Sequence, residues 1–390
     1  MSEWRDVQLK DVLQPKGYIR GPFGSALRRN DLLDHGIPVY EQQHAIYGIR
    51  DFRFYIDNEK YEAMRRFATI TDDIIISCSG TLGRVSRIKA NDPKGIISQA
   101  LLLLRVDAQK IRSRYLQYFL SSKEGFNAMV SRSGGSVQVN LARREIIETI
   151  PFGLPDLQEQ DRILGVLSSL DDKIELLCNQ NRILESLAKT YFRQWFVESK
   201  TQTGRLDSIA NITMGQSPKG DSYNEEGLGT VFFQGRAEFG WRFPTIRLYT
   251  TSPQRMAQKG DILMSVRAPV GDINIAIMDC CIGRGLAAIR SEYPTFTLYA
   301  IKGQGDQLEI FNGEGTVFGS ISKDGLNGLS IPMPSKKRIQ EFEDRFSILD
   351  EKIKANSEQV LTLQKLRDTL LPKLISGEIR VNQYEVNVNG

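Results

Sequence analysis

One long segment of this chain occurs twice. Residues 155–198 and 334–377 align at an offset of 179 residues, which places Pro155 on Pro334 and Leu170 on Leu349. A repeat of this length, with a whole domain's worth of different sequence between its copies, indicates a duplicated molecule with an approximate two-fold relation between its halves. Such a molecule is suited to a target that also has two parts.

Both copies have the residue spacing of a coiled-coil helix, with apolar residues separated alternately by four and three positions. In the first copy these residues are Ile163, Leu167, Leu170, Ile174, Leu177, Leu184, Ala188, Tyr191 and Trp195. In the second copy they are Phe342, Phe346, Leu349, Ile353, Val360, Leu363, Leu370 and Leu374. Asp156 followed by Glu159 predicts a capped start for the first helix, and Pro372 predicts an end or a kink in the second. A helix of about 39 residues would be about 58 Å long.

Each apolar seam contains one polar residue, Asn181 in the first copy and Asn356 in the second. If the two helices pack antiparallel about a common midpoint, these asparagines should meet. A paired asparagine lowers stability but fixes the register of a coiled coil. The alternative is that each side chain is solvated independently.

The segments outside the repeats have the pattern of mixed α/β domains, with aliphatic and β-branched runs between Gly, Pro and Asp residues. We expect strands at 74–78, 96–106, 231–234, 261–266 and 272–278, and helices at 113–121 and 123–132. These segments also resemble each other, since Gly80–Val85 matches Ala268–Ile273. The predicted fold is α+β, with two mixed α/β domains separated by two long antiparallel coiled-coil helices in a pseudo-two-fold internal repeat. The predicted parts are 1–154 (first domain), 155–203 (central helix), 204–333 (second domain) and 334–390 (distal helix and C-terminal tail).

The sequence contains no recognisable catalytic motif. Its only histidines are His35 and His44, so neither a histidine metal site nor a Ser-His-Asp triad can occur in both halves. No phosphate-binding GxxxxGK[ST] loop is present, and no GxGxxG follows a strand. A nuclease-like pattern of Asp156, Asp171 and Lys173 falls on the first helix, where capping and a solvated helix face explain it better. We therefore expect a protein with no catalytic residues and no metal of its own.

Composition and charge limit the protein class further. The longest strictly apolar run, at 100–104, is far too short for a membrane span, and the N-terminus lacks the apolar region of a signal peptide. The four cysteines have neither disulfide nor zinc spacing, so we expect a cytoplasmic protein. Residues 1–150 carry 23 Lys and Arg against 17 Asp and Glu, a net charge of +6, whereas residues 205–334 carry 12 against 13, a net charge of −1. A basic first domain suits a polyanionic partner.

Several longer phrases resemble one known family. IPFGLPDLQEQDRI (150–163), LDDKI (170–174) and LLPKLISGEIRV (370–381) are similar to conserved regions of the DNA specificity subunits of type I restriction-modification systems. GPFGSALRRNDLLDHGIPVY (21–40), ISCSGTLGRV (76–85) and GQSPKGDSYNEEG (215–227) resemble phrases of the target-recognition domains in that family. The resemblance covers nearly the whole chain.

The resemblance implies that each target-recognition domain reads one half of a bipartite, gapped sequence in double-stranded DNA. It also implies that the helices act as a spacer ruler and bind two methyltransferase (modification) subunits. Those subunits would hold S-adenosylmethionine and modify adenine, and restriction/translocase subunits would join for cleavage. The specificity subunit itself would hold no cofactor and catalyse no step. The neutral second domain departs from the basic surface expected of a DNA-binding protein. Two explanations are open: its arginines (Arg236, Arg242, Arg247 and Arg267) cluster locally, or the partner subunits supply most of the phosphate contacts.

DNA reading requires long polar side chains on loops, because Arg recognises guanine, Gln and Asn recognise adenine, and Lys or Arg bind phosphate. The DNA-binding residues predicted on this basis in the first domain are Lys16, Arg20, Ser25, Gln42, Gln43, His44, Arg84, Gln138 and Asn140. Those in the second domain are Lys219, Tyr223, Gln234, Arg236, Arg267 and Lys323. An ordinary solvated surface role is the alternative for each of them. For His44, a further alternative is a hydrogen-bonded structural histidine.

Two other functional classes compete with DNA recognition. A non-catalytic scaffold whose duplicated domains bind protein or carbohydrate would explain the neutral second domain. A nuclease or methyltransferase would need motifs that the sequence lacks. Binding of a gapped, two-part duplex, weakened steeply by salt, distinguishes a DNA specificity subunit from a scaffold.

Overall fold

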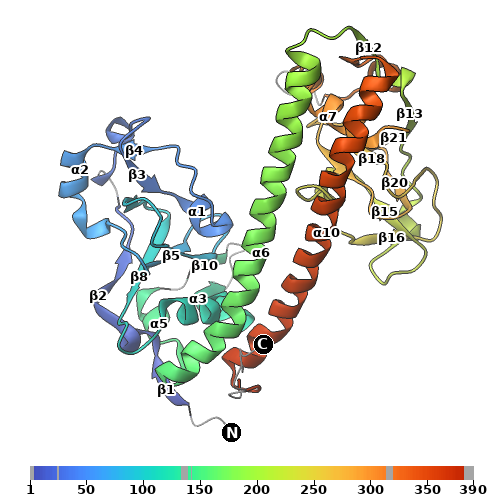
Figure 1. Ribbon diagram of the computed structural model, residues 1–390. Coiled ribbons are helices and arrows are strands. Elements are labelled where there is room, and N and C mark those ends of the chain that lie inside the picture. The colour runs from blue at the N-terminus through green and yellow to red at the C-terminus, as the bar shows by residue number, and fades with distance from the viewer. Residues whose placement is uncertain (1–3, 24–25, 133–138, 142, 313–318, 382–390) are drawn as a thin grey trace, which may run out of the picture. The chain divides into compact units, whose positions relative to one another are not determined.

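The computed structural model describes residues 4–23, 26–132, 139–141, 143–312 and 319–381 (Figure 1). The chain forms two compact units: unit 1 comprises residues 1–175 and 360–390, and unit 2 comprises residues 176–359. Each unit contains part of both long helices, α6 (Leu157–Phe192) and α10 (Lys336–Ile375). Within the described ranges, no helix is both long and apolar enough to cross a membrane.

Unit 1 is built around a four-stranded antiparallel sheet in the order β2-β8-β5-β6. Its strands are β2 (Leu13–Arg20), β8 (Leu101–Val106), β5 (Ile74–Ser77) and β6 (Val85–Arg87). Successive side chains of a strand point to opposite faces. Ile74 and Leu104 therefore face a core shared with α3 (Ser113–Ser121) and α6, whereas Ile75 and Leu103 pack with Tyr40 of the neighbouring sheet. Burial on both faces explains why β5 and β8 are almost entirely apolar.

The neighbouring sheet of unit 1 has the order β4-β3-β7, and its β3 and β7 run parallel. Its strands are β3 (Ile37–Tyr40), β4 (Tyr55–Ile56) and β7 (Ile96–Ile97). Two-stranded pairs are formed by β1 (Arg5–Gln8) with β11 (Pro151–Leu154), and by β9 (Val130–Arg132) with β10 (Val139–Leu141). The remaining helices of unit 1 are α1 (Gln42–Tyr47), α2 (Asn58–Ala63), α4 (Lys123–Met129) and α5 (Arg144–Glu148).

Unit 2 repeats this arrangement. Its four-stranded antiparallel sheet is β13-β21-β18-β19, and a second sheet, β14-β16-β15-β20-β17, contains the parallel pair β15–β20. The strands are β12 (Thr203–Arg205), β13 (Ala210–Met214), β14 (Tyr223–Asn224), β15 (Thr230–Phe233), β16 (Leu248–Thr250), β17 (Met256–Ala257), β18 (Ile262–Ser265), β19 (Ile273–Ile275), β20 (Cys280–Ile282), β21 (Leu286–Ser291) and β22 (Ser330–Pro332), which pairs with β12. The shorter helices are α7 (Pro294–Lys302), α8 (Gly305–Glu309) and α9 (Lys323–Asn327).

The correspondence between the units extends to single hydrogen bonds. The Ser77 hydroxyl donates to the Thr81 carbonyl oxygen at 2.6 Å, and the Ser265 hydroxyl donates to the Pro269 carbonyl oxygen at 2.8 Å. Each serine closes the turn that follows the third strand of its four-stranded sheet. The similarity between 80–85 and 268–273 therefore reflects two equivalent turns, as the sequence predicts.

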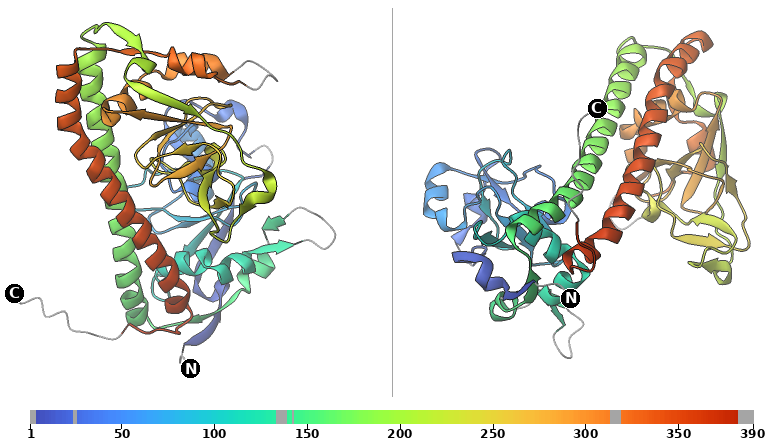
Figure 2. Two further views of the ribbon diagram at one scale, coloured as in Figure 1. Left: turned by 90° about the vertical axis from the view of Figure 1, so that its right-hand side faces the viewer. Right: turned by 60° about the horizontal axis from the view of Figure 1, so that its bottom comes forward.

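In unit 2 the two long helices pack antiparallel, and the two asparagines meet as predicted. Nδ2 of Asn356 donates to Oδ1 of Asn181 at 2.9 Å. Ten residues further along α6 stands Tyr191, and ten residues back along α10 stands Phe346; their ring centroids lie 5.4 Å apart. Both views of Figure 2 show these helix segments side by side. Because both asparagines are buried, pairing satisfies amide groups that would otherwise lose their hydrogen bonds to water.

In unit 1 the start of α6 packs against the end of α10. Ile163 of α6 lies in the same buried core as Leu374 of α10. Asp171 accepts a hydrogen bond from Arg367 Nη1 at 2.9 Å. The start of α6 is capped as predicted, because the Glu159 amide donates to Asp156 Oδ1 at 2.8 Å. Asp156 and Asp171 therefore serve the helices and do not form a nuclease site.

Three predicted elements differ from those observed. The single strand expected at 96–106 is two strands, β7 and β8, because the chain passes from one sheet to the other between them. The helix expected at 123–132 ends at Met129, and the last three residues form β9. Pro372 does not end α10, which continues to Ile375.

Candidate nucleic-acid interface

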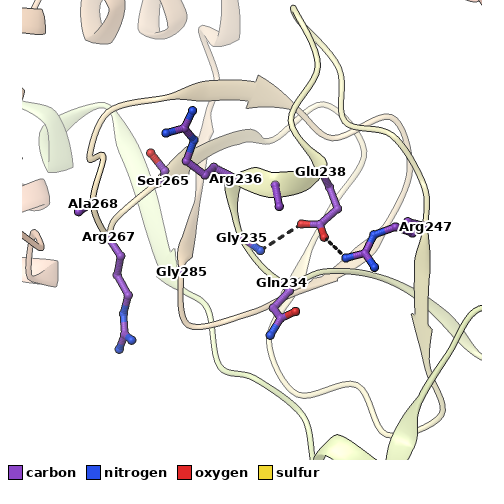
Figure 3. A pocket seen from close by; sticks show the side chains of 10 residues that line it. Gln234, Gly235, Arg236, Glu238, Arg247, Ser265, Arg267, Ala268 and Gly285 are labelled. Atoms are coloured by element: carbon purple, nitrogen blue, oxygen red, sulfur yellow. Dashed lines mark hydrogen bonds and ion pairs between the residues drawn. The ribbon is translucent and has the colours of Figure 1, made fainter. Parts of the chain in front are cut away.

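Unit 2 contains a pocket of about 310 Å³ (Figure 3). Most of its wall comes from the segment after β15 and from the turn between β18 and β19. The lining residues are Gln234, Gly235, Arg236, Ala237, Glu238, Arg247, Ser265, Arg267, Ala268 and Gly285. The two sheets of unit 2 pack together through a core that includes Phe233 of β15 and Leu263 of β18. This packing brings the carboxyl ends of β15 and β18 to one pocket.

Three of the six residues predicted in this part of the chain, Gln234, Arg236 and Arg267, meet at this pocket. All three are exposed. Arg267 also lines a neighbouring pocket of about 300 Å³ together with Arg284. The structure therefore joins amide and guanidinium donors that are far apart in the sequence.

Acidic residues hold this wall in shape. The buried carboxylate of Glu238 accepts hydrogen bonds from the Gly235 amide at 3.3 Å and from Arg247 Nη2 at 2.8 Å. Arg236 forms an ion pair with Asp272, with 2.8 Å between Nε and Oδ2. A guanidinium has five N–H donors, so a contact through Nε leaves the terminal nitrogens of Arg236 for a ligand. These ion pairs explain why a unit with nearly balanced charge can still offer cationic donors at one pocket.

The other three predicted residues of this part lie elsewhere. Lys219 is exposed in the turn before β14, and Lys323 is exposed at the first position of α9. Tyr223 is half-buried; its ring centroid lies 4.8 Å from that of Phe232, and its hydroxyl donates to the Pro218 carbonyl at 3.1 Å. These contacts give Tyr223 a structural role.

Unit 1 has the equivalent turn between β5 and β6. Ser77 closes it, and the Arg84 amide donates back to the Ser77 hydroxyl at 2.9 Å. The Gln42 side chain, from the segment after β3, donates to the Ser79 carbonyl. Arg84 is exposed, and its guanidinium lies over the Phe126 ring, 6.0 Å from the centroid. Gln42 and Arg84 thus lie beside the turn of unit 1 that is equivalent to the turn beside Gln234 and Arg267 in unit 2, although the residue equivalent to Arg84 itself is Asp272.

The structure contradicts the prediction that His44 contacts DNA. His44 is 0% exposed, and its ring stacks on Phe52 with centroids 4.6 Å apart. Nδ1 accepts the Glu41 amide hydrogen at 2.6 Å, and Nε2 lies 3.0 Å from the Asp51 carbonyl oxygen, to which it donates in the neutral tautomer. These contacts support the alternative of a hydrogen-bonded structural histidine. The neighbouring Gln43 also donates to Asp51, at 3.2 Å, and so helps to hold the same segment.

Burial lowers the pKa of His44 below its usual value, and this predicts a pH-dependent stability of unit 1. Below about pH 6.5 the unfolded chain protonates this histidine, while the folded chain keeps it neutral until a lower pH. Stability should therefore fall as pH drops from about 6.5 through the folded-state pKa. Urea unfolding of the wild type and of His44→Gln at pH 7.5 and 5 measures the effect. The wild type should lose more stability than the variant, and an equal loss in both would refute the prediction.

The remaining predicted residues of the first domain lie on strands β2 and β10 or outside the described residues. Lys16 is exposed at an irregularity of β2, with a φ of 62°. Arg20, at the end of β2, is partly exposed and interacts with the buried thiol of Cys78. Asn140 lies in β10 opposite Ser131. Ser25 and Gln138 lie outside the described residues.

The arginine cluster expected in unit 2 is only partly correct. Arg236, Arg247 and Arg267 do line one pocket, but Arg242 is buried and points to the helices. Sequence reasoning missed Arg284. Gly21 and Gly215 donate to the carbonyl oxygens of Leu101 and Leu286, both at 2.9 Å, so Gly283–Leu286 in unit 2 corresponds to Ser98–Leu101 in unit 1. That segment of unit 1 contains no predicted DNA-binding residue, so comparing the two halves would not have revealed Arg284.

The chemistry available at these edges is recognition by hydrogen bonds and positive charge. Amide side chains can pair with adenine, and guanidinium groups can pair with guanine or phosphate. Among the residues that the structure describes, no group of three or more His, Cys, Asp or Glu side chains is arranged to hold a metal ion.

Comparisons with known proteins agree with this chemistry. Residues 1–186 match the family model of the type I restriction modification DNA specificity domain. The chain is 29% identical to a Methanocaldococcus jannaschii protein named as the type I restriction enzyme MjaX specificity subunit, over 97% of this chain and 94% of that protein. It is 26% identical to the MjaIX specificity subunit of the same organism, over 70% of each chain. A solved type I restriction-modification S subunit from M. genitalium shares the fold, with a TM-score of 0.61, 18% identity and 96% of both chains covered.

The match to the specificity domain and the alignment with relatives along most of the chain are consistent with a chain whose two units each carry polar side chains beside an equivalent turn. The chain is similar along nearly its whole length to DNA specificity subunits of type I restriction-modification systems, and its residues 1–186 match the DNA specificity domain of that family.

Proposed function

We propose that this subunit reads a bipartite, gapped DNA sequence, one half with each unit. The supporting observation is the equivalence of the two polar edges. In unit 1 Gln42 and Arg84 flank the turn after β5, and in unit 2 Gln234, Arg236 and Arg267 flank the turn after β18. Two copies of one binding surface with different side chains suit two half-sites of different sequence. An unrelated protein- or carbohydrate-binding scaffold would not need guanidinium and amide donors beside the equivalent turn of both units.

In this proposal the helices have two roles. The central helix, within 155–203, and the distal helix, within 334–390, would form an antiparallel coiled coil that separates the target-recognition domains, 1–154 and 204–333, and so sets the gap between half-sites. The pair of Asn181 and Asn356 supports such a ruler, because a buried asparagine pair disfavours other registers. The outer helix faces would bind two methyltransferase subunits that hold S-adenosylmethionine. Restriction/translocase subunits would complete the complex in the cytoplasm.

Genome-wide adenine methylation in the source cells, with and without this chain, tests the proposal. Loss of methylation at one gapped, two-part motif is the expected result, and it would also identify the target. If the partner subunits are expressed and the methylation pattern does not change, the proposal fails.

The pocket of unit 2 gives a residue-level prediction. Arg267→Ala should weaken binding of the methyltransferase complex to its target by about 1–3 kcal/mol, the usual value of one arginine–base contact, which is roughly fivefold to 150-fold. Discrimination between bases should be lost only in the half-site read by unit 2. Competition binding with single-base variants of both half-sites measures this.

Arg205→Ala is the matched control. Arg205 is an exposed arginine of unit 2 that pairs with Asp207 at 2.6 Å and does not line the pocket. Its loss should leave base discrimination unchanged. Altered discrimination in the half-site read by unit 1 would show that the assignment of Arg267 is wrong.

A further inference from the structure

Unit 2 buries one arginine between its two helix segments. Arg242 is only 2% exposed and lies in the loop between Phe239 and Pro244. Its Nη1 lies 3.3 Å from Glu185 Oε1 of α6, and its Nη2 binds Asp350 of α10. One side chain of the recognition unit therefore binds both long helices.

Charged side chains and an aromatic ring surround Arg242. Its guanidinium lies 5.7 Å from the ring centroid of Tyr299 in α7, and the Tyr299 hydroxyl donates to Asp350 at 3.0 Å. Glu185 also pairs with Lys302 of α7. A buried ion pair is often no more stabilising than well-packed apolar residues. Its strict geometry instead favours one arrangement of the parts that it joins.

The loop that carries Arg242 is firmly attached to the pocket wall. The buried Asn274 of β19 exchanges two hydrogen bonds with the backbone of Gly240, both at 3.0 Å. The Ile275 amide donates to the Arg242 carbonyl at 3.0 Å, and the Thr245 amide donates to the Glu238 carbonyl at 2.8 Å. Glu238 in turn shapes the pocket, so the contacts run without a break from the pocket to the helices.

In the described part of unit 1, no arginine at the equivalent place binds both long helices. Tyr118 binds Asp171 as Tyr299 binds Asp350, but the arginine that pairs with Asp171 is Arg367, which belongs to α10 itself. In each of the other ion pairs between this part of unit 1 and α6, the carboxylate is exposed; one of these pairs is Lys89 with Glu175 at 2.7 Å. A buried arginine that reaches from the recognition part to both helices is thus a feature of unit 2 among the described residues.

We propose that Arg242 is a positioning residue that fixes the recognition part of unit 2 on both helices and thereby enforces one spacing between the half-sites. This rests on the proposed function. Arg242 would not contact DNA. Its loss would relax the spacing requirement and leave the base requirement of each half-site unchanged, which distinguishes it from Arg267.

The test uses Arg242→Met/Asp350→Asn in the full complex with its methyltransferase subunits. This pair of substitutions removes one positive and one negative charge, keeps the side-chain volume, and leaves Glu185 with Lys302. Methylation rates are measured on duplexes with the natural gap and with the gap changed by one base pair. The wild type should strongly prefer the natural gap, because other gaps require the DNA to deform. In the variant, the ratio of the methylation rate at the natural gap to that at the altered gap should fall roughly tenfold, since a loosely held domain no longer imposes this deformation.

Lys89→Met/Glu175→Gln, which removes an exposed pair of unit 1, is the matched control and should keep the wild-type preference. Arg242→Lys is the second variant, because one ammonium cannot bind two helices as a guanidinium fork does; it should relax the gap partially. Folding is checked by thermal unfolding. An unchanged gap preference in the folded variants overturns the proposal. Failure of the proposed function would look different, since the wild type itself would then not depend on a gapped motif.

Discussion

Deleting residues 178–184 from α6 together with residues 353–359 from α10 should shorten the preferred gap between half-sites by about three base pairs. Seven helical residues span about 10 Å, and B-DNA rises about 3.4 Å per base pair. The two deletions are in register, because Asn181 faces Asn356 at the centre of both. A heptad changes the direction of the following side chains by only about 20°. Glu185 and Asp350, which fix Arg242, are retained.

On the original target, this variant would have to deform the DNA at a cost of order 1–6 kcal/mol. Methylation at the original gap should therefore fall by at least about fivefold, while a target with the shorter gap becomes the best substrate. A duplex library with fixed half-sites and variable gaps measures this. Deleting residues 178–184 alone is the control, and it should disrupt helix packing and abolish methylation at every gap. If the double deletion changes the half-site bases or keeps the original gap, the helices are not the ruler.

Replacing Phe342 by alanine should destabilise unit 2 by about 3–5 kcal/mol, the usual cost of removing a large aromatic side chain from a core. Phe342 is 0% exposed. Its ring contacts aromatic rings of α6, α7 and α10 and of the turn after α6; these belong to Phe192, Trp195, Phe196, Phe296, Tyr299 and Phe346. Because the Phe342 ring contacts residues of three helices, the cavity that its removal leaves cannot be filled by a shift of one side chain.

Urea unfolding followed by circular dichroism and tryptophan fluorescence measures the loss, and Trp195 reports directly because its ring lies 6.1 Å from that of Phe342. Ile348→Ala is the matched control on the same helix. Ile348 is 63% exposed, so its loss should change stability by no more than about 0.5 kcal/mol. A loss below about 1 kcal/mol for Phe342→Ala would contradict the assigned core.

Much of the architecture follows from the sequence because it depends on local periodicity. The alternating spacing of apolar residues predicts both long helices, and the helix at 113–121 agrees residue for residue with α3. The meeting of Asn181 and Asn356 is also predictable, because a duplicated sequence restricts how two antiparallel helices can align. The boundaries that failed, at 96–106 and 123–132, are places where the chain enters another sheet, and no local pattern records that.

The roles of single polar residues were decided by the tertiary structure. Arg242 and Arg267 are both arginines on loops of unit 2, yet one is buried against Glu185 and Asp350 while the other is exposed at a pocket. His44 is a residue type that often binds ligands at a surface, but here its side chain is buried and accepts a hydrogen bond from the Glu41 amide. Such side chains are long and can pair with groups more than a hundred residues away. The sequence by itself determined a duplicated molecule with two paired helices and no recognisable catalytic motif. Only the packing of the sheets decided which donors face outward, because burial of a charged or polar group depends on partners that local sequence does not contain.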